Sequence, residues 1–120
     1  MAIVIGIAVL LVLAVLAGVW LFRFRPLSVY AWTTRSALAR AGLHKVTVSS
    51  PAGPQVVWTG GSGPVMVLLH GAGDQAGTWF RVAPALVKTR TLIVPDLAGH
   101  GDSAPRRGPI PAQAVYDGVV

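Results

Sequence analysis

The sequence contains no cysteine and no glutamate, and four aspartates are the only acidic residues among 120. Without cysteine the chain forms no disulfide bond and no thiolate metal site. Ten lysine and arginine residues oppose the aspartates, which gives a formal net charge of +6. A nucleic-acid-binding protein would gather such residues on one face or helix, often beside a zinc or helix-turn-helix pattern. Here they are scattered along the chain, so we expect no nucleic-acid partner.

Charge is also missing from the start of the chain, where Ala2–Phe22 has no charged or strongly polar side chain. A helix of this length reaches roughly 30 Å, which is the thickness of the hydrocarbon core of a bilayer. The segment is apolar on every side, and this excludes an amphipathic helix that lies on a membrane surface. We therefore predict a transmembrane anchor over residues 1–25, with the lipid bilayer as the partner of Ala2–Phe22.

The alternative for this segment is a signal peptide that is cleaved after export. A signal peptide would need basic residues before a shorter apolar core. Instead, Arg23 and Arg25 follow the apolar run, and five basic residues lie between Arg23 and Lys45. Because positive charge is retained on the cytoplasmic side of membranes, we expect the rest of the chain on that side of a single-pass anchor.

Residues 26–43 are interpreted as a juxtamembrane connector that acts as a spacer. Ser36–Ala41 is expected to form one helical turn that ends at Gly42, and we assign the connector no chemistry. From residue 44 onward, short apolar runs alternate with turn residues. The third predicted segment is therefore a folded domain over residues 44–120.

Four strands and two helices are predicted in this domain. The strands cover residues 45–49, 55–59, 65–69 and 91–95, and the helices cover 78–87 and 112–120. The first two strands form a hairpin around the turn at 51–54. The other two are continuous apolar runs, typical of strands covered on both faces. Pro84 is expected to shorten or kink the first helix. The order predicts an α/β fold that combines an antiparallel hairpin with one parallel β-α-β unit.

Two motifs follow the two apolar strands. His70-Gly-Ala-Gly73 comes directly after residues 65–69, and Asp96-Leu-Ala-Gly-His-Gly-Asp-Ser103 comes directly after residues 91–95. Together, in this order and at this spacing, they resemble the HGxG and DxxGHGxS loops of α/β-hydrolases. The resemblance covers residues 45–120, about a quarter of a family domain. It implies that this part of the chain is the N-terminal portion of an α/β-hydrolase sheet.

The resemblance also implies roles for the residues of both loops. In this family the residue after His-Gly supplies one backbone N–H of the oxyanion hole, and that residue here is Ala72. Gly71 and Gly73 shape its turn, and His70 is expected to fix the loop rather than to act as a general base. The second loop is expected to hold its shape through hydrogen bonds of its Ser and Asp side chains to nearby backbone. Its structural residues are Asp96, Gly99, His100, Gly101 and Ser103.

A catalytic triad made of Asp96, His100 and Ser103 is rejected, because no strand-turn-helix elbow carries the serine. In the family the nucleophile, the acid and the catalytic histidine come later than these two loops. We therefore expect the 120 residues to be an N-terminal fragment of a membrane-anchored serine hydrolase for ester or related acyl substrates, inactive by itself.

Two alternatives stay open at this point. One is a small single-pass membrane protein with a truncated, non-catalytic hydrolase-like domain. The other is the dehalogenase and epoxide-hydrolase branch of the fold, which uses an aspartate nucleophile. A small-molecule substrate is expected for the full-length enzyme, and no cofactor is implied because side chains and water suffice for this chemistry. Asp74, Asp96 and Asp102 are too dispersed along loops to predict a metal site.

Overall fold

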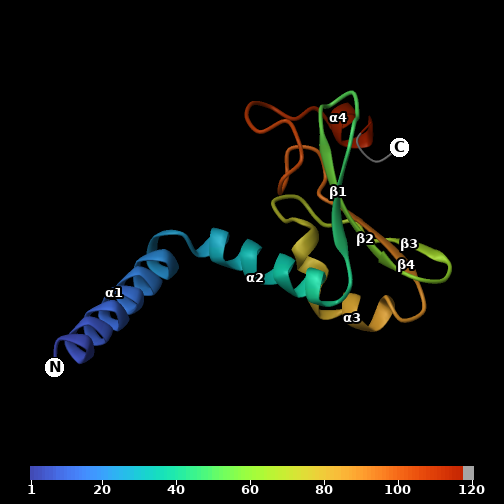
Figure 1. The fold of residues 1–120 in the computed structure, drawn as a ribbon. Coiled ribbons are helices and arrows are strands. Elements are labelled where there is room, and N and C mark those ends of the chain that lie inside the picture. Colours follow the sequence, from blue (N-terminus) through green and yellow to red (C-terminus); the bar gives the residue numbers. More distant parts are fainter. Residues whose placement is uncertain (118–120) are drawn as a thin grey trace. The chain divides into compact units, whose positions relative to one another are not determined.

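The computed structural model describes residues 1–117 (Figure 1). The chain divides into two compact units, Met1–Trp32 and Thr33–Val120, which are described separately. The first unit begins with helix α1 (Ala2–Phe24), and helix α2 (Pro26–Arg40) starts in the same unit. Arg25 separates the two helices, with φ −134°. Proline disfavours helical geometry in the residue before it and is itself well placed at a helix start, so Arg25-Pro26 ends one helix and begins the next.

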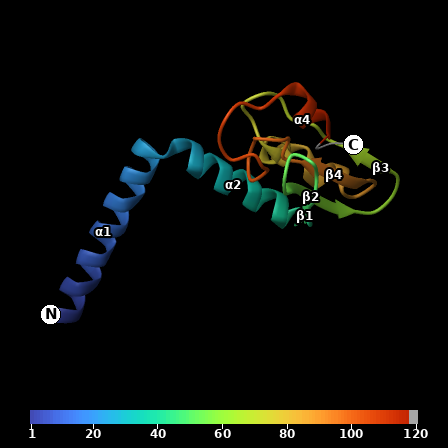
Figure 2. The same cartoon turned by 90° about the horizontal axis from the view of Figure 1, so that it is seen from above.

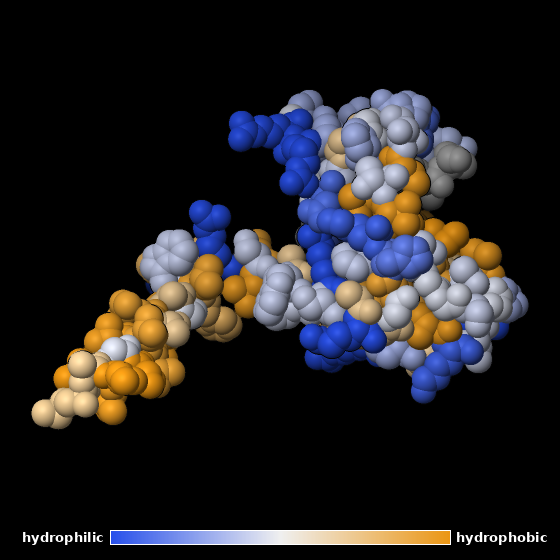
Figure 3. All heavy atoms as spheres, in the orientation of Figure 1, coloured by the Kyte–Doolittle hydropathy of each residue, from blue (hydrophilic) through white to orange (hydrophobic). Residues whose placement is uncertain are grey.

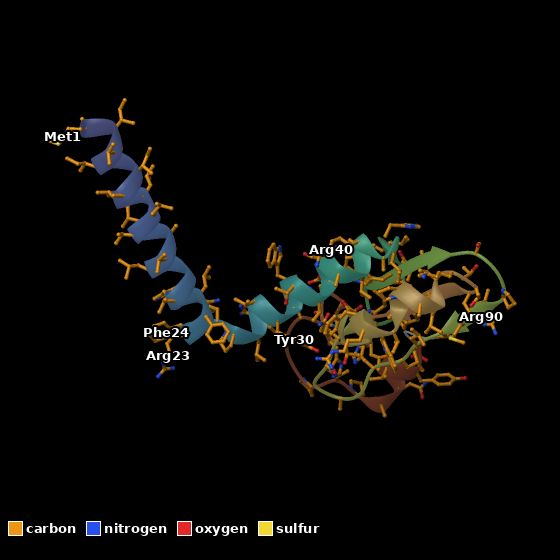
Figure 4. The ribbon with its side chains drawn as sticks, turned by 90° about the horizontal axis from the view of Figure 1, so that it is seen from below. Met1, Arg23, Phe24, Tyr30, Arg40 and Arg90 are labelled. Atoms are coloured by element: carbon orange, nitrogen blue, oxygen red, sulfur yellow. The ribbon has the colours of Figure 1, made fainter. Side chains whose placement is uncertain are left out.

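Helix α1 has no buried residue along its whole length, and the face of it seen in Figure 3 is mostly orange, that is, apolar. Aromatic and basic side chains gather near its end. The Trp20 and Phe24 rings lie 5.9 Å apart, and the Arg23 guanidinium carbon lies 5.6 Å from the centre of the Phe24 ring (Figure 4). The helix is long and apolar enough to cross a membrane, although a signal sequence would meet the same criteria.

The second unit contains a four-stranded mixed sheet, whose strands in chain order are β1 (His44–Val48), β2 (Gln55–Gly61), β3 (Val65–Val67) and β4 (Thr91–Pro95). Their order in the sheet is β1-β2-β4-β3. Strands β1 and β2 are antiparallel, as are β2 and β4, whereas β3 and β4 are parallel. The helical elements that follow β3 are the 3₁₀ helix η1 (Ala76–Arg81), α3 (Ala83–Leu86) and α4 (Ala112–Asp117). The predicted fold class, a hairpin joined to one parallel β-α-β unit, is confirmed.

The core lies against one face of this sheet. Trp58 of β2 and Val94 of β4 are directly opposite each other and are both buried. Leu38 of α2, Ala76 of η1 and Ala83 of α3 complete the cluster from the helical side. Figure 2 shows the four strands of the sheet from above. The core therefore places the start of η1, and the loop that precedes it, next to the carboxyl end of β4.

Two predicted elements differ from the structure in this region. The helix predicted over residues 78–87 is instead η1 and α3, which meet at Val82. Pro84 occupies the second position of α3, where its missing N–H is tolerated, so the break falls just before it, as its chemistry requires. Strand β3 is shorter than predicted, and Val65 and Val67 are 64% and 50% exposed. The prediction that this strand is covered on both faces is wrong for the described residues.

The segment over residues 26–43 also differs from the expected spacer with one helical turn. Helix α2 has fifteen residues, and Thr34 and Leu38 on it are buried. Leu38 packs in the core together with Leu43, so the second half of α2 is a structural element of the folded unit. At the other end, the helix predicted from Ala112 is α4, and its expected last residues, 118–120, lie outside the described residues.

Candidate active-site loops

The first loop connects β3 to η1 and carries an exposed turn. His70 is buried, whereas Gly71, Ala72 and Gly73 are exposed. The Asp74 N–H donates to the Gly71 carbonyl at 3.2 Å and closes the turn. Within residues 1–117, the Ala72 N–H donates to no protein group. An N–H without a partner among the described residues, in an exposed turn, is available to a ligand oxygen.

The two glycines of this turn are not equivalent. Gly73 has φ +79°, a conformation that side-chain-bearing residues adopt at a cost. Gly71 has no such φ, and a Cβ atom added there would meet nothing within 4 Å. The structure therefore gives a backbone reason for glycine at position 73, and the shaping role of Gly71 stays a prediction.

His70 joins the first loop to the second. Its Nε2 accepts the Leu97 N–H at 2.9 Å, and its Nδ1 lies 2.8 Å from the Gly71 carbonyl oxygen. A carbonyl oxygen only accepts, so Nδ1 carries the proton in this arrangement and Nε2 is free to accept. Both ring nitrogens are thereby occupied by backbone groups. This geometry supports a structural role for His70.

The second loop, from Asp96 to Ser103, is centred on the buried Asp96 carboxylate. Its Oδ1 accepts the Ala76 N–H at 2.7 Å, and its Oδ2 accepts the Asp102 N–H at 3.0 Å. Ser103 Oγ donates to the Asp96 carbonyl at 2.5 Å and accepts the Val56 N–H at 2.8 Å. One carboxylate and one hydroxyl therefore fix the loop to itself, to η1 and to β2.

Glycine is required at one point of this loop. Gly101 has φ +52°, and a Cβ atom there would collide with the carboxyl group of Asp96. Gly99 also has a positive φ and lies against the side chain of Ile110. The loop thus wraps closely around the Asp96 carboxylate, and backbone without side chains makes that approach sterically feasible.

The structure does not connect Asp96, His100 and Ser103 as a catalytic relay. His100 Nδ1 lies 3.0 Å from the Ala98 carbonyl oxygen, and the His100 ring lies 5.3 Å from the His70 ring. Ser103 Oγ is buried and is engaged by two backbone groups. A nucleophilic serine needs a base within hydrogen-bond reach, and Ser103 has none among the described residues.

Arg35 of α2 is a site residue that sequence analysis missed. Its guanidinium donates to Gln75 Oε1 at 3.0 Å, to Asp102 Oδ2 at 3.1 Å and to Asp96 Oδ2 at 3.3 Å. These partners lie between 40 and 67 positions away in the sequence. No spacing rule links residues so far apart, so only the tertiary fold reveals the cluster.

Basic side chains also surround Asp102. Partial burial would raise its pKa, but Arg35, Lys45 and Arg106 outweigh that effect and hold the pKa of Asp102 below its usual value. The Lys45 ammonium lies 3.4 Å and the Arg106 guanidinium 3.7 Å from the carboxylate. The second loop therefore carries an ionised aspartate with three cationic neighbours.

The region that contains both loops matches a known protein family. Residues 64–117 match the family described as alpha/beta hydrolase fold. An uncharacterized protein of Mycobacterium tuberculosis is 42% identical over 59 residues, covering 49% of this chain and 17% of the relative. A fluoroacetate dehalogenase of a Burkholderia species is 47% identical over 45 residues, covering 38% and 15%. The chain thus spans less than a fifth of the length of these two curated relatives.

Among solved structures, a bacterial membrane phospholipase A is similar with a TM-score of 0.63 and 29% identity. The similarity covers 96% of this chain and 37% of the phospholipase. Over the part of the chain that these comparisons cover, the structure has an α/β-hydrolase fold.

Proposed function

We propose that this chain is the N-terminal part of a membrane-anchored serine hydrolase that acts on ester or related acyl substrates. The observation that carries the proposal is the N–H of Ala72, which lies in the exposed turn after β3 and donates to no group among the described residues. Acyl transfer places negative charge on the former carbonyl oxygen. One preorganised donor to that oxygen is worth roughly 2.7–4 kcal/mol in enzymes of this kind.

The turn around Ala72 is held on both sides, which supports its role as a preorganised donor. On one side, His70 is tied to Leu97. On the other, the Ala76 N–H is tied to the buried Asp96 carboxylate. A donor fixed before substrate arrives needs little reorganisation during the reaction, and this is the source of its catalytic value.

The proposal assigns the nucleophile to a segment that follows these loops in longer relatives. The solved phospholipase is similar to this chain over 37% of its own length, which leaves most of its fold beyond the match. Within residues 1–117, Ser103 is engaged by backbone, and Ser62 lies in the loop between β2 and β3 rather than on a strand-turn-helix elbow. Ala72 would therefore supply one oxyanion donor to a serine carried elsewhere.

The membrane part of the proposal is supported by α1, which is long and apolar enough to cross a bilayer, and by the similarity to a membrane phospholipase A. The bilayer would take up Ala2–Phe22, and Trp20 would lie at the interface, where aromatic side chains collect. Arg23 and Arg25 would then remain on the cytoplasmic side together with the hydrolase domain.

A second candidate function is the branch of this fold that uses an aspartate nucleophile. Its support is the 47% identity over 45 residues to a fluoroacetate dehalogenase. Both branches of the fold contain these two loops. The sequence around the nucleophile therefore distinguishes the serine enzyme from the aspartate enzyme. Gly-x-Ser-x-Gly downstream of Val120 in the gene would support the serine enzyme, and Gly-x-Asp-x-Gly would support the second candidate.

The full-length protein in detergent tests the proposal, with a short-chain p-nitrophenyl ester as the probe. Ala72→Pro removes the N–H and is expected to lower kcat by about 10²–10³-fold. Ala72→Ser keeps the N–H and is the matched control, with kcat within about threefold of wild type. Equal activities of the two folded variants, or no ester hydrolysis by the wild-type protein, would contradict the proposal.

A further inference from the structure

Three groups converge on the guanidinium of Arg35, and they belong to both active-site loops. Nε binds Gln75 of the first loop, while Nη1 and Nη2 bind Asp102 and Asp96 of the second. The Arg35 side chain is 18% exposed, so these contacts are sheltered from water. Hydrogen bonds to charged groups in such surroundings are stronger than neutral ones.

Helix α2 also holds the end of the first loop through Gln75. The Gln75 side chain caps η1, because its Oε1 accepts the Gly77 N–H at 2.8 Å. The same oxygen accepts from Arg35 Nε, and Gln75 Nε2 donates to Thr34 Oγ1 at 3.1 Å. Gln75 is buried and lies three residues after Ala72. Thr34 and Arg35, two successive residues of α2, therefore hold Gln75 at the end of the first loop.

Arg35 is also connected to the first loop through Asp96. The Asp96 side chain has no exposed surface, and within the described residues Arg35 is the one cation within ion-pair distance. A buried carboxylate needs such a partner, because removing one member leaves an uncompensated charge. Asp96 in turn holds the Ala76 N–H at the start of η1. A displaced Asp96 would release the first loop at the same end that Gln75 holds.

We propose that Arg35 is the positioning residue of the oxyanion loop, which it ties from helix α2 through Gln75 and Asp96. It touches no reacting atom in this account; it acts by keeping the Ala72 N–H in place. The inference rests on the proposed function of Ala72. It makes α2, which follows the apolar helix in the chain, part of the catalytic apparatus rather than a spacer.

The guanidinium is suited to this task because its donors point in fixed directions. Arg35 uses three nitrogens on three acceptors, whereas lysine offers one ammonium on a flexible stem. Arg35→Lys therefore keeps the charge near Asp96 but loses the simultaneous contact with Gln75. This variant separates charge compensation from geometric positioning.

The test compares Arg35→Met and Arg35→Lys with the control Arg40→Met in the full-length protein. Arg40 lies on the same helix, is exposed, and is labelled in Figure 4. With the same ester probe, Arg35→Met is expected to lower kcat by about ten- to a hundredfold, the scale of loss for a misplaced catalytic group, with KM changed less than about threefold. Arg35→Lys should recover part of kcat, and Arg40→Met should match wild type.

Amide hydrogen exchange supplies a readout that is independent of activity. In Arg35→Met, amides of residues 71–77 should exchange faster, while those of β2 and β4 keep their wild-type protection. A uniform loss of protection, or kcat values that match Arg40→Met, would overturn the proposal. If Arg35→Met does not fold, the same comparison is made with Arg35→Lys. If the wild type hydrolyses no ester, the function assigned to Ala72 fails, yet faster exchange confined to residues 71–77 would still establish Arg35 as the tether.

Discussion

The Nε2 atom of His70 accepts the backbone N–H of Leu97 at 2.9 Å, and this bond joins the loop after β3 to the loop after β4. His70→Ala would leave the Leu97 N–H without its protein partner. Loss of such a bond destabilises a protein by about 1–3 kcal/mol. We expect a loss of this size in the free energy of unfolding, measured by urea denaturation. His44→Ala is the control, because His44 is exposed on β1. Equal midpoints for the two variants would show that the bond contributes little.

Gly101 is predicted to be the least replaceable glycine of the second loop. Gly101→Ala combines a strained φ of +52° with a collision against the Asp96 carboxyl group. Gly108→Ala is a matched control for strain alone, since it has φ +91° and nothing within 4 Å of an added Cβ. The control should lose about 1 kcal/mol of stability, whereas Gly101→Ala should lose clearly more. Equal losses in thermal melts would mean that the loop can move away from Asp96.

Leu38 tests whether the second half of α2 is part of the fold. Its side chain is fully buried, and Leu38→Ala is expected to cost about 2–5 kcal/mol of unfolding free energy. Leu27→Ala on the same helix is the control, because Leu27 is 81% exposed. A spacer would tolerate both changes equally, so equal stabilities would restore the connector interpretation of residues 26–43.

The surroundings of Asp102 predict a pH dependence of stability. Its folded-state pKa lies below its usual value of 3.8, so its ion pairs stabilise the fold above that pH. That contribution is lost as the pH falls through the lower, folded-state pKa. The stability difference between wild type and Asp102→Asn should therefore be full near neutral pH and shrink below about pH 4. Unfolding curves across this range provide the measurement, and a difference that stays constant with pH would contradict the assignment.

The fold could be predicted because its signals are local. Apolar runs mark the strands, and Pro84 marks the break between η1 and α3 within one residue or two. The exposure of Val65 and Val67 was not predictable in this way, since a continuous apolar run does not specify which face is covered. The same limit applies to α2, where Leu38 supplies one core contact amid a helix of mixed polarity.

The candidate site likewise contains residues that the sequence identifies and one residue that only the structure identifies. His70, Ala72 and Asp96 stand in motifs whose chemistry is visible in consecutive residues. Arg35 stands in no motif, and its importance comes from partners that the tertiary fold brings together. Residues within a loop motif can be identified from the sequence. A residue that lies on another element and hydrogen-bonds to the loop can be identified only from the structure.

Covalent labelling of the full-length protein tests whether it is a membrane-bound serine hydrolase. Membranes from cells that express it would be treated with a fluorescent fluorophosphonate, which reacts with activated serine nucleophiles. We expect a labelled band of the protein's size in the membrane fraction, weakened in Ala72→Pro and retained in Ala72→Ser. A folded, membrane-bound protein that takes up no label would contradict the assignment as a serine hydrolase.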